Sequence, residues 1–289
     1  MVIGEEIIYE KKSHADSVDS LCVNGKNIVS ASFDGSIKTT NNNETTIIGK
    51  HNDWVRKVIC TDSNIISASN DGMITIWSDY KKIKSIQAHS WWITDIVLSG
   101  DKIVSVSLDE TVKVWSYPEL KLLYSHKLYG SNKHYSIAVN NGKAFIGSTH
   151  GLMSILDISS FEWIESKMIA GTYAILISAT KSKKHIIFGS SDGFIIKVMA
   201  SPPYNMLKEK ISNFALKAVA QSEGILYVGD DNGVIRKISI DNIKEPYVLS
   251  RFPEAVRALT IDNDLIYAGY DNGHIRIFNK MAKISGKQE

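Results

Sequence analysis

The sequence has little cysteine, no long apolar run and almost no net charge, and each shortage excludes a class of protein. Two cysteines in 289 residues cannot form a disulfide framework, so Cys22 and Cys60 are expected to be buried, reduced thiols in a reducing compartment. A net charge of +2 provides no general attraction to nucleic acid or to an anionic membrane. The longest useful uncharged stretch, residues 168–180, is shorter than the roughly 20 apolar residues that cross a bilayer. No membrane-spanning segment is therefore expected.

The sequence also lacks a secretion leader and the usual motifs of metal binding and catalysis. Its first residues are acidic where a signal peptide is basic, so we expect a cytoplasmic protein, with a nuclear location left open. The eight histidines form no cluster at metal-ligand spacing, and the acidic turn at residues 230–233 lacks the spaced ligands of a calcium loop. No glycine-rich phosphate loop occurs. These absences predict no metal and no cofactor.

What the sequence does contain is a repeat of about 40 residues. Small or polar residues, then a turn with Asp or Asn beside Gly, then an alternating strand recur seven times. The turn residues are Asp34, Asp71, Asp109, His150, Asp192, Asn232 and Asn272, at intervals of 37–42 residues. This period is typical of repeat architectures such as propellers.

Each repeat has the pattern of a four-stranded antiparallel meander. Apolar and polar residues alternate over residues 73–77, and Gly-containing turns separate the short strands. In the second repeat the pattern predicts strands near residues 54–61, 64–70, 73–78 and 82–88. A sheet of this size cannot bury both faces alone, so the repeats are expected to stack radially as a propeller, which protects their edges.

Four polar side chains stand at identical offsets from the turn Asp in the second and third repeats. They are His51, Ser67, Asp71 and Trp77 in the second repeat, and His89, Ser105, Asp109 and Trp115 in the third. In these residues the sequence resembles the WD-repeat (WD40) family, and the likeness covers essentially the whole chain. The resemblance implies an all-β, seven-bladed propeller in which each set forms a buried, hydrogen-bonded structural tetrad.

Several repeats depart from the family pattern. The first repeat keeps His14, Ser30 and Asp34 but has Thr40 where the Trp is expected, and the fourth to seventh repeats lose almost the whole tetrad. We expect apolar packing to replace the polar network there. The Trp-Asp pair that names the family is absent.

The ends of the chain predict how the ring closes. Residues 5–12 read as an outer strand without its own repeat, and the resemblance implies that they complete the seventh blade; residues 280–285 are the alternative. A single propeller domain is expected over residues 1–289, with a loose tail at 281–289. The repeats are predicted near residues 14–49, 51–87, 89–128, 132–168, 172–209, 212–250 and 254–280.

Two classes of function remain, a binding platform and a catalytic propeller with a site in its channel. His, Ser and Asp are the side chains of acyl-transfer sites, but here they stand at repeat positions with a Trp donor attached, which favours a structural role. A catalytic channel also needs titratable groups near its axis. The residues expected there are apolar: Val18, Val55, Ile93, Ala174, Ala215 and Val256. We therefore predict no enzyme and no catalytic residue.

The resemblance places partner contacts on the narrower top face, at the loop that enters the first strand of each repeat. This loop holds the positions 17 and 15 residues before the turn residue, with a longer turn assumed in the fifth repeat. The predicted binding residues are Trp54, Arg56, Trp92, Thr94, Lys133, Tyr135, Tyr173, Phe214 and Arg257. Trp, Tyr and Arg carry most of the energy of protein interfaces. We expect a protein or peptide partner that is acidic, phosphorylated or ubiquitin-like, with nucleic acid less favoured, and a protein that is monomeric alone but part of a complex.

Overall fold

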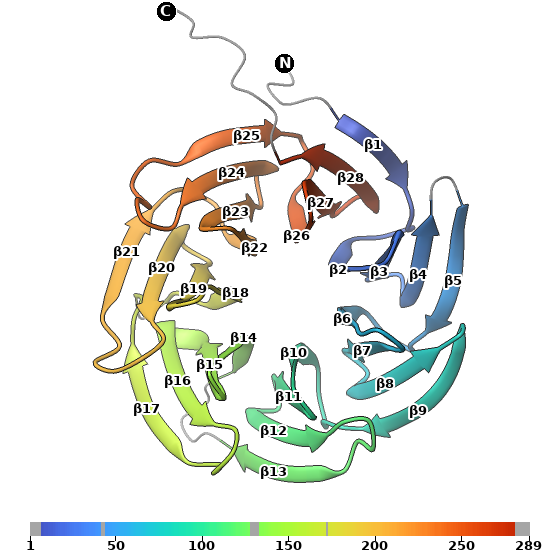
Figure 1. Cartoon of the computed structure of the whole chain (residues 1–289), viewed down its shortest axis with the longest axis horizontal. Helices are drawn as coiled ribbons and strands as arrows, with labels where there is room; N and C mark the ends of the chain where they lie inside the picture. Colours follow the sequence, from blue (N-terminus) through green and yellow to red (C-terminus); the bar gives the residue numbers. More distant parts are fainter. Residues whose placement is uncertain (1–6, 42–43, 128–132, 172, 281–289) are drawn as a thin grey trace, which may run out of the picture.

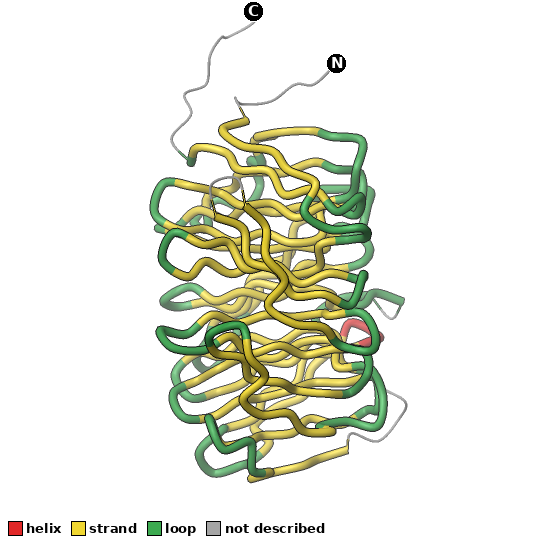
Figure 2. Tube along the Cα trace, turned by 90° about the vertical axis from the view of Figure 1, so that its right-hand side faces the viewer, coloured by secondary structure: helices red, strands yellow, loops and turns green. Residues whose placement is uncertain are grey.

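Seven four-stranded antiparallel sheets surround a central axis in the computed structural model of the chain (Figure 1). The structure describes residues 7–41, 44–127, 133–171 and 173–280. Within these residues the one helical element is a single 3₁₀ turn at Thr149–Gly151, and the loops lie mainly on the two flat faces of the disc (Figure 2). The predicted all-β, seven-bladed propeller is confirmed.

In each blade the strands run in sequence order from the axis to the rim. Blade 1 has β2 (Val18–Asn24), β3 (Asn27–Ser32), β4 (Ser36–Asn41) and β5 (Glu44–Lys50). Blade 2 has β6 (Val55–Cys60), β7 (Ile65–Ser69), β8 (Met73–Ser78) and β9 (Lys81–Gln87). Blade 3 has β10 (Ile93–Ser99), β11 (Lys102–Ser107), β12 (Thr111–Ser116) and β13 (Leu122–Lys127). Blade 4 has β14 (His134–Asn140), β15 (Lys143–Ser148), β16 (Leu152–Asp157) and β17 (Trp163–Met168).

Blades 5 and 6 repeat this plan, and blade 7 takes its outer strand from the start of the chain. Blade 5 has β18 (Leu176–Lys181), β19 (His185–Ser190), β20 (Phe194–Met199) and β21 (Met206–Lys210). Blade 6 has β22 (Leu216–Ser222), β23 (Ile225–Asp230), β24 (Val234–Ser239) and β25 (Tyr247–Arg251). Blade 7 has β26 (Val256–Asp262), β27 (Leu265–Tyr270), β28 (His274–Asn279) and β1 (Ile7–Lys12).

The ring closes through the pairing of β1 with β28. The two strands are antiparallel, with Lys12 opposite His274 and Ile7 opposite Phe278. The predicted N-terminal closing strand is confirmed over residues 7–12, which occupy the edge that residues 280–285 would have taken. Residues 5–6 and the predicted tail at 281–289 lie outside the described residues.

An arginine joins the closing strand to the rest of blade 7. The Arg276 guanidinium donates to Glu10 of β1 at 2.8 Å and to Glu254 at 3.0 Å. The same guanidinium lies 4.1 Å from the ring centroid of Phe252 and 4.3 Å from that of Tyr270. A cation held between two aromatic rings and two carboxylates contributes to the closure of the ring together with the backbone ladder.

Apolar side chains fill the space between neighbouring blades, and small polar groups link the inner strands. Between blades 2 and 3, for example, Ile66 and Ala68 pack with Ile93 and Ile103. The Val58 amide of blade 2 donates to Ser20 Oγ of blade 1 at 3.1 Å, and the Ile137 amide donates to Asp95 at 3.1 Å in the corresponding place between blades 3 and 4. These bonds fix the spacing of the inner strands around the axis.

The glycine of the recurring turn is required by the chain that passes over it. Gly273 has φ +85°, and a Cβ there would lie 2.2 Å from the carbonyl oxygen of His14. The Gly273 carbonyl also accepts the Ser13 amide at 3.0 Å. A larger residue would displace the loop that carries the first tetrad histidine, which explains the glycine after the turn residue here and in every blade except blade 3, where Glu110 has a φ of 69°.

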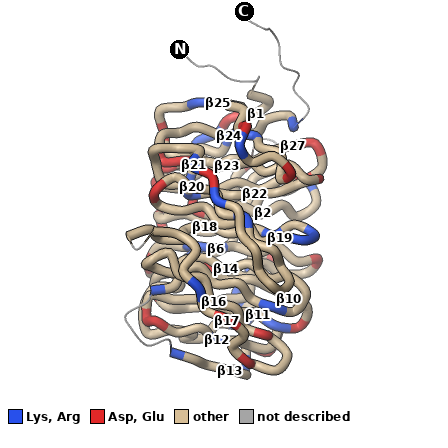
Figure 3. Tube along the Cα trace, turned by 90° about the vertical axis from the view of Figure 1, so that its left-hand side faces the viewer, with Lys and Arg blue, Asp and Glu red and all other residues tan. Residues whose placement is uncertain are grey.

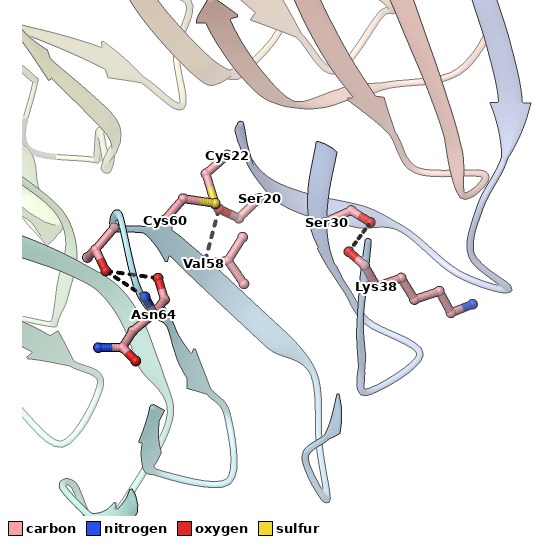
Figure 4. Close-up of a disulfide and its surroundings, with 8 residues drawn as sticks. Ser20, Cys22, Ser30, Lys38, Val58, Cys60 and Asn64 are labelled. Atoms are coloured by element: carbon pink, nitrogen blue, oxygen red, sulfur yellow. Dashed lines mark hydrogen bonds between the residues drawn. A yellow bond between two sulfur atoms is a disulfide. The ribbon is translucent and has the colours of Figure 1, made fainter. Parts of the chain in front are cut away.

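The two cysteines are joined by a disulfide, so the expectation of two reduced thiols was wrong. Cys22 on β2 bonds Cys60 on β6, with their Cα atoms 5.8 Å apart (Figure 4). When the first two repeats are aligned on their turn residues Asp34 and Asp71, the two cysteines stand at adjacent positions of the first strand. Successive side chains of a strand point to opposite faces of the sheet. Because blades stack with unlike faces together, this difference turns the two thiols toward each other. The argument for a reducing compartment is therefore removed.

Charges of both signs are mixed over the side of the disc, as the small net charge suggested (Figure 3). Within the described part of the chain, no helix has the length and apolar character that crossing a membrane requires.

Candidate binding site at the mouth of the channel

One side chain from each blade lines the mouth of the central channel. These seven residues stand 15 positions before the turn residue: Asp19, Arg56, Thr94, Tyr135, Ile177, Lys217 and Arg257. They border a cavity of about 470 Å³. The residue before each of them lies at the start of the inner strand and turns away from the axis; Val18, Val55 and Val256 are completely buried between blades. The expectation of an apolar axis was therefore wrong, because alternation along the strand places the next residue in the channel.

The structure brings six of the nine predicted binding residues together around this cavity. They are Trp54, Arg56, Trp92, Thr94, Tyr135 and Arg257. Lys133 is close by, with its amino group 4.9 Å from the ring centroid of Trp91, which contacts Trp92. Tyr173, whose side chain is 97% exposed, and Phe214 do not line the cavity.

The misplaced predictions come from an error of register in blades 5 and 6. Leu176 pairs with Ser190, and Leu216 pairs with Asp230, in the same way as Val55 pairs with Ser69 in blade 2. No longer turn is present in blade 5. Applying the offset of 15 without adjustment leads to Ile177 and Lys217, so the repeat itself carried the signal for the missed lysine.

A stack of aromatic rings holds Arg56 at the mouth. Phe33 and Trp54 are stacked with their centroids 4.1 Å apart, and Trp92 lies 6.0 Å from Trp54. The Arg56 guanidinium lies 4.7 Å from the ring of Phe33 and 5.1 Å from that of Trp54. It donates to Asp19 at 3.3 Å. Contacts on its faces and edge fix this arginine before any partner arrives.

Cations outnumber carboxylates in the cavity wall. Arg56, Lys57, Lys217 and Arg257 contribute positive charge there, whereas Asp19 and Asp95 contribute negative charge. Lys57 is paired with Asp95 at 2.9 Å, and Asp231 outside the wall lies within 4.0 Å of both Lys217 and Arg257.

The central carboxylate of this cluster is held in a dry environment. Burial raises the pKa of Asp19 above its ordinary value, although Arg56, Arg257 and Lys217 each favour its charged form. Burial likewise raises the pKa of Tyr135, so its hydroxyl stays protonated and can donate a hydrogen bond. The mouth thus offers cationic, aromatic and hydroxyl donors to an incoming group.

The two tetrads are closed hydrogen-bond chains away from the cavity. In blade 2, Trp77 Nε1 donates to Ser67 Oγ at 2.7 Å, Ser67 lies 2.7 Å from His51 Nε2, and His51 Nδ1 donates to Asp71 at 3.0 Å. In blade 3 the corresponding distances are 2.9, 2.7 and 3.0 Å for Trp115, Ser105, His89 and Asp109.

In blade 3 the surroundings keep the tetrad histidine neutral and the tetrad aspartate charged. Burial lowers the pKa of His89. Burial opposes the charge on Asp109, but the interactions with His89, Thr111 and the Ser90 amide together outweigh it and hold the pKa of Asp109 well below its ordinary value. Ser67 and Ser105 are fully buried, which keeps their hydroxyls from a substrate.

The blades without a complete tetrad use other contacts. In blade 4, Ile146 and Leu156 are fully buried, in line with the expected apolar packing. Blade 6 departs from that expectation, because buried Asp230 accepts hydrogen bonds from Arg236 at 2.6 Å and from Ser212 at 2.7 Å. Blade 7 departs from it too, through the guanidinium of Arg276 described above. In both blades the Trp position itself is apolar, with Ile238 and Phe278 buried, and the polar contacts come from an arginine two residues earlier on the third strand, which the tetrad offsets did not reveal.

Comparison with known proteins agrees with this architecture. Residues 5–39, 42–78 and 80–116 match the WD40 family model, described as "WD domain, G-beta repeat". Three WD40 repeats are thus detected between residues 5 and 116, and the chain as a whole has the seven-bladed β-propeller fold. WD40 propellers generally serve as scaffolds for protein interaction and are generally not catalytic.

Solved structures similar to this propeller share its fold at low sequence identity. The WD40 β-propeller domain of Doa1 is 16% identical, with a TM-score of 0.83 over 96% of this chain and 97% of that chain. The computationally designed Ika8 protein is 17% identical, with a TM-score of 0.73 over 96% of this chain and 100% of that chain. No curated protein sequence matches the chain.

Proposed function

We propose that this WD40 propeller is a non-catalytic platform that binds an acidic or phosphorylated segment of a partner protein at the channel mouth on its top face. The observation that carries the proposal is the ring of Arg56, Lys217 and Arg257 beside the stacked Phe33 and Trp54. Guanidinium groups bind carboxylates and phosphates through two parallel hydrogen bonds, and aromatic neighbours add apolar contact area. A ubiquitin-like partner would have to present such a segment.

The same geometry supports a binding role over an enzymatic one. Among the described residues of the cavity wall, Asp95 is paired with Lys57 and Asp19 with Arg56, so both carboxylates are already engaged in ion pairs. The His-Ser-Asp sets are buried in the tetrads. Hydrolase and dehydrogenase screens are expected to show no turnover; a reproducible activity abolished by Lys217→Met would contradict this.

The test of the platform compares two charge-reversal variants that differ in the face they change. Wild-type protein, Lys217→Glu/Arg257→Glu and the opposite-face control Lys183→Glu, at an exposed lysine that lines neither cavity, are immobilised and exposed to lysate of the source cells. Partners retained by wild type should be lost with the double variant and kept with the control. Fluorescence polarisation then measures binding of a phosphorylated segment of each retained partner.

The measurement distinguishes the proposal from its alternatives. The proposal fails if the double variant keeps every partner while Lys183→Glu loses them. If the only retained ligand is nucleic acid that salt removes, the mouth acts as a general anion site and a protein partner is excluded. Light scattering of the isolated chain should give a monomer. A cytoplasmic location stays a prediction, for which fractionation of source cells is the direct measurement.

A further inference from the structure

On the face opposite the channel mouth, four blades fill the crevice toward the preceding blade with their own side chains. The segment between the third and fourth strands supplies these apolar groups: Tyr117 and Leu120 in blade 3, Ile158 and Phe161 in blade 4, Ala200 and Tyr204 in blade 5, and Ile240 and Ile243 in blade 6. The contacts cross to the neighbouring blade. The Tyr117 hydroxyl accepts from Asn64 at 2.9 Å, and Tyr204 packs edge-on against Phe145.

Blade 2 does not fill its crevice. Its turn between β8 and β9 has only two residues, Asp79 and Tyr80, where blade 3 has five at 117–121. A cavity of about 240 Å³ remains between blades 1 and 2. Its lining residues are Asn24, Asn27, Val29, Thr39, Ile48, Asp62, Ser63, Asn64, Ile65, Trp77, Ser78, Asp79 and Tyr80.

Tyr80 is the counterpart of the residues that fill the other crevices. Leu120, Phe161 and Tyr204 have φ values of 51°, 62° and 53°, and Tyr80 has a φ of 60°. Leu120 and Tyr204 are buried, whereas Tyr80 on its short turn is 58% exposed and stands at the edge of the cavity. Two-residue turns with both φ values positive favour Asn-Gly. Tyr80 therefore adopts a backbone conformation that is unfavourable for a residue with a large side chain.

The rim of this crevice carries charge of the sign opposite to the channel mouth. Asp62 and Asp79 are exposed, and neither forms an ion pair within the described residues. The amides of Asn24 and Asn27 add hydrogen-bonding groups to the rim. Lys82 lies 5.8 Å from the Trp77 ring but does not line the cavity. An occupant with a basic residue beside its apolar side chain fits this rim.

We propose that the crevice between blades 1 and 2 binds a leucine or isoleucine side chain of a partner protein, on a segment with lysine or arginine next to it. The partner supplies from outside the apolar group that blades 3 to 6 supply from their own loops. The apolar floor of Ile48, Ile65 and Trp77 takes the aliphatic group, and Asp62 and Asp79 take the cation. This second surface is independent of the channel mouth and would let the propeller join two partners.

The experiment uses short capped peptides and methyl NMR of the full chain. Acetyl-Lys-Leu-Lys-amide is titrated while the Ile48 and Ile65 methyl signals are followed. Two matched peptides, acetyl-Lys-Ser-Lys-amide and acetyl-Glu-Leu-Glu-amide, change only the apolar group or only the charge. We expect the leucine peptide to shift both signals and to bind at least tenfold more tightly than the serine peptide, because the apolar side chain leaves water.

Two variants decide the location and the charge preference. Replacing residues 79–80 with the blade 3 segment 117–121 fills the crevice from within and should abolish the shifts. Asp62→Lys/Asp79→Lys alters only exposed side chains and should reverse the preference toward the glutamate peptide. The proposal is overturned if the leucine peptide binds no better than the serine peptide, or if the charge reversal leaves the preference unchanged. Loss of the folded state in the graft would leave the charge-reversal arm to decide.

Discussion

Breaking the Cys22–Cys60 bond should lower the stability of the propeller by about 4 kcal/mol. The bond joins residues 38 positions apart in sequence. In the chain-entropy account, closing a loop of that length removes roughly 13 cal/mol/K of entropy from the unfolded chain, or about 4 kcal/mol at 25 °C. For a chain of this size each kcal/mol corresponds to about 2 °C, so Tm should fall by roughly 8 °C or more.

The assay is thermal unfolding followed by circular dichroism, with and without dithiothreitol. Wild-type protein should melt lower in reductant, and Cys22→Ser/Cys60→Ser should melt at that lower temperature in both buffers. Alkylation of the unreduced protein in denaturant, followed by mass spectrometry, should find neither thiol free. If reductant leaves Tm of the wild type unchanged while alkylation shows that the bond has been reduced, the entropic reasoning is refuted. Labelling of both cysteines before reduction would refute the pairing itself.

Three further predictions concern the tetrads, the response to acid and the closure of the ring. Trp77→Phe removes the N–H that Ser67 accepts and should cost about 1–3 kcal/mol in urea unfolding, with binding at the channel mouth kept; loss of binding at the mouth without loss of stability would contradict the structural role. Burial lowers the pKa of His134 to about 4. Between pH 6.5 and 4 this histidine is therefore protonated in the unfolded chain but neutral in the folded chain, and the free energy of unfolding should fall by about 3 kcal/mol over this range. His134→Asn should flatten this dependence, and an equally steep profile in the variant would assign the effect elsewhere. Arg276→Met leaves Glu10 unpaired and should cost about 1–3 kcal/mol, detected as a lower Tm, whereas Lys12→Met at an exposed position of the same strand is the control; equal losses in both variants would show that the guanidinium contacts add nothing specific.

The repeat was enough to predict the fold because every blade uses the same local chemistry. The strands of blade 2 start and end within two residues of their predicted positions, since Gly-containing turns and alternation fix them locally. The closing strand could be predicted because Ile7–Lys12 has the pattern of an outer strand and no repeat of its own.

What the sequence did not reveal depends on contacts between blades. The disulfide between Cys22 and Cys60 could be predicted only by knowing that opposite faces of neighbouring blades pack together. The hydrogen bond from Arg236 to Asp230 could be predicted only by knowing which side chains are buried side by side. The open crevice did leave a trace. The interval from Asp71 to Asp109 is 38 residues, and the interval from Asp109 to His150 is 41 residues. This difference of three residues equals the difference in length between the two-residue turn of blade 2 and the five-residue turn of blade 3.

The pairing of β1 with β28 sets an order of events during synthesis on the ribosome. Ile7–Lys12 is translated before its partner His274–Asn279, which follows more than 260 residues later. Until β28 has been translated, the blades already formed make an incomplete ring, and the strands at its two ends have unpaired edges. β1 must therefore stay unpaired with any other strand until β28 is available. The ring closes only when the seventh blade has been translated.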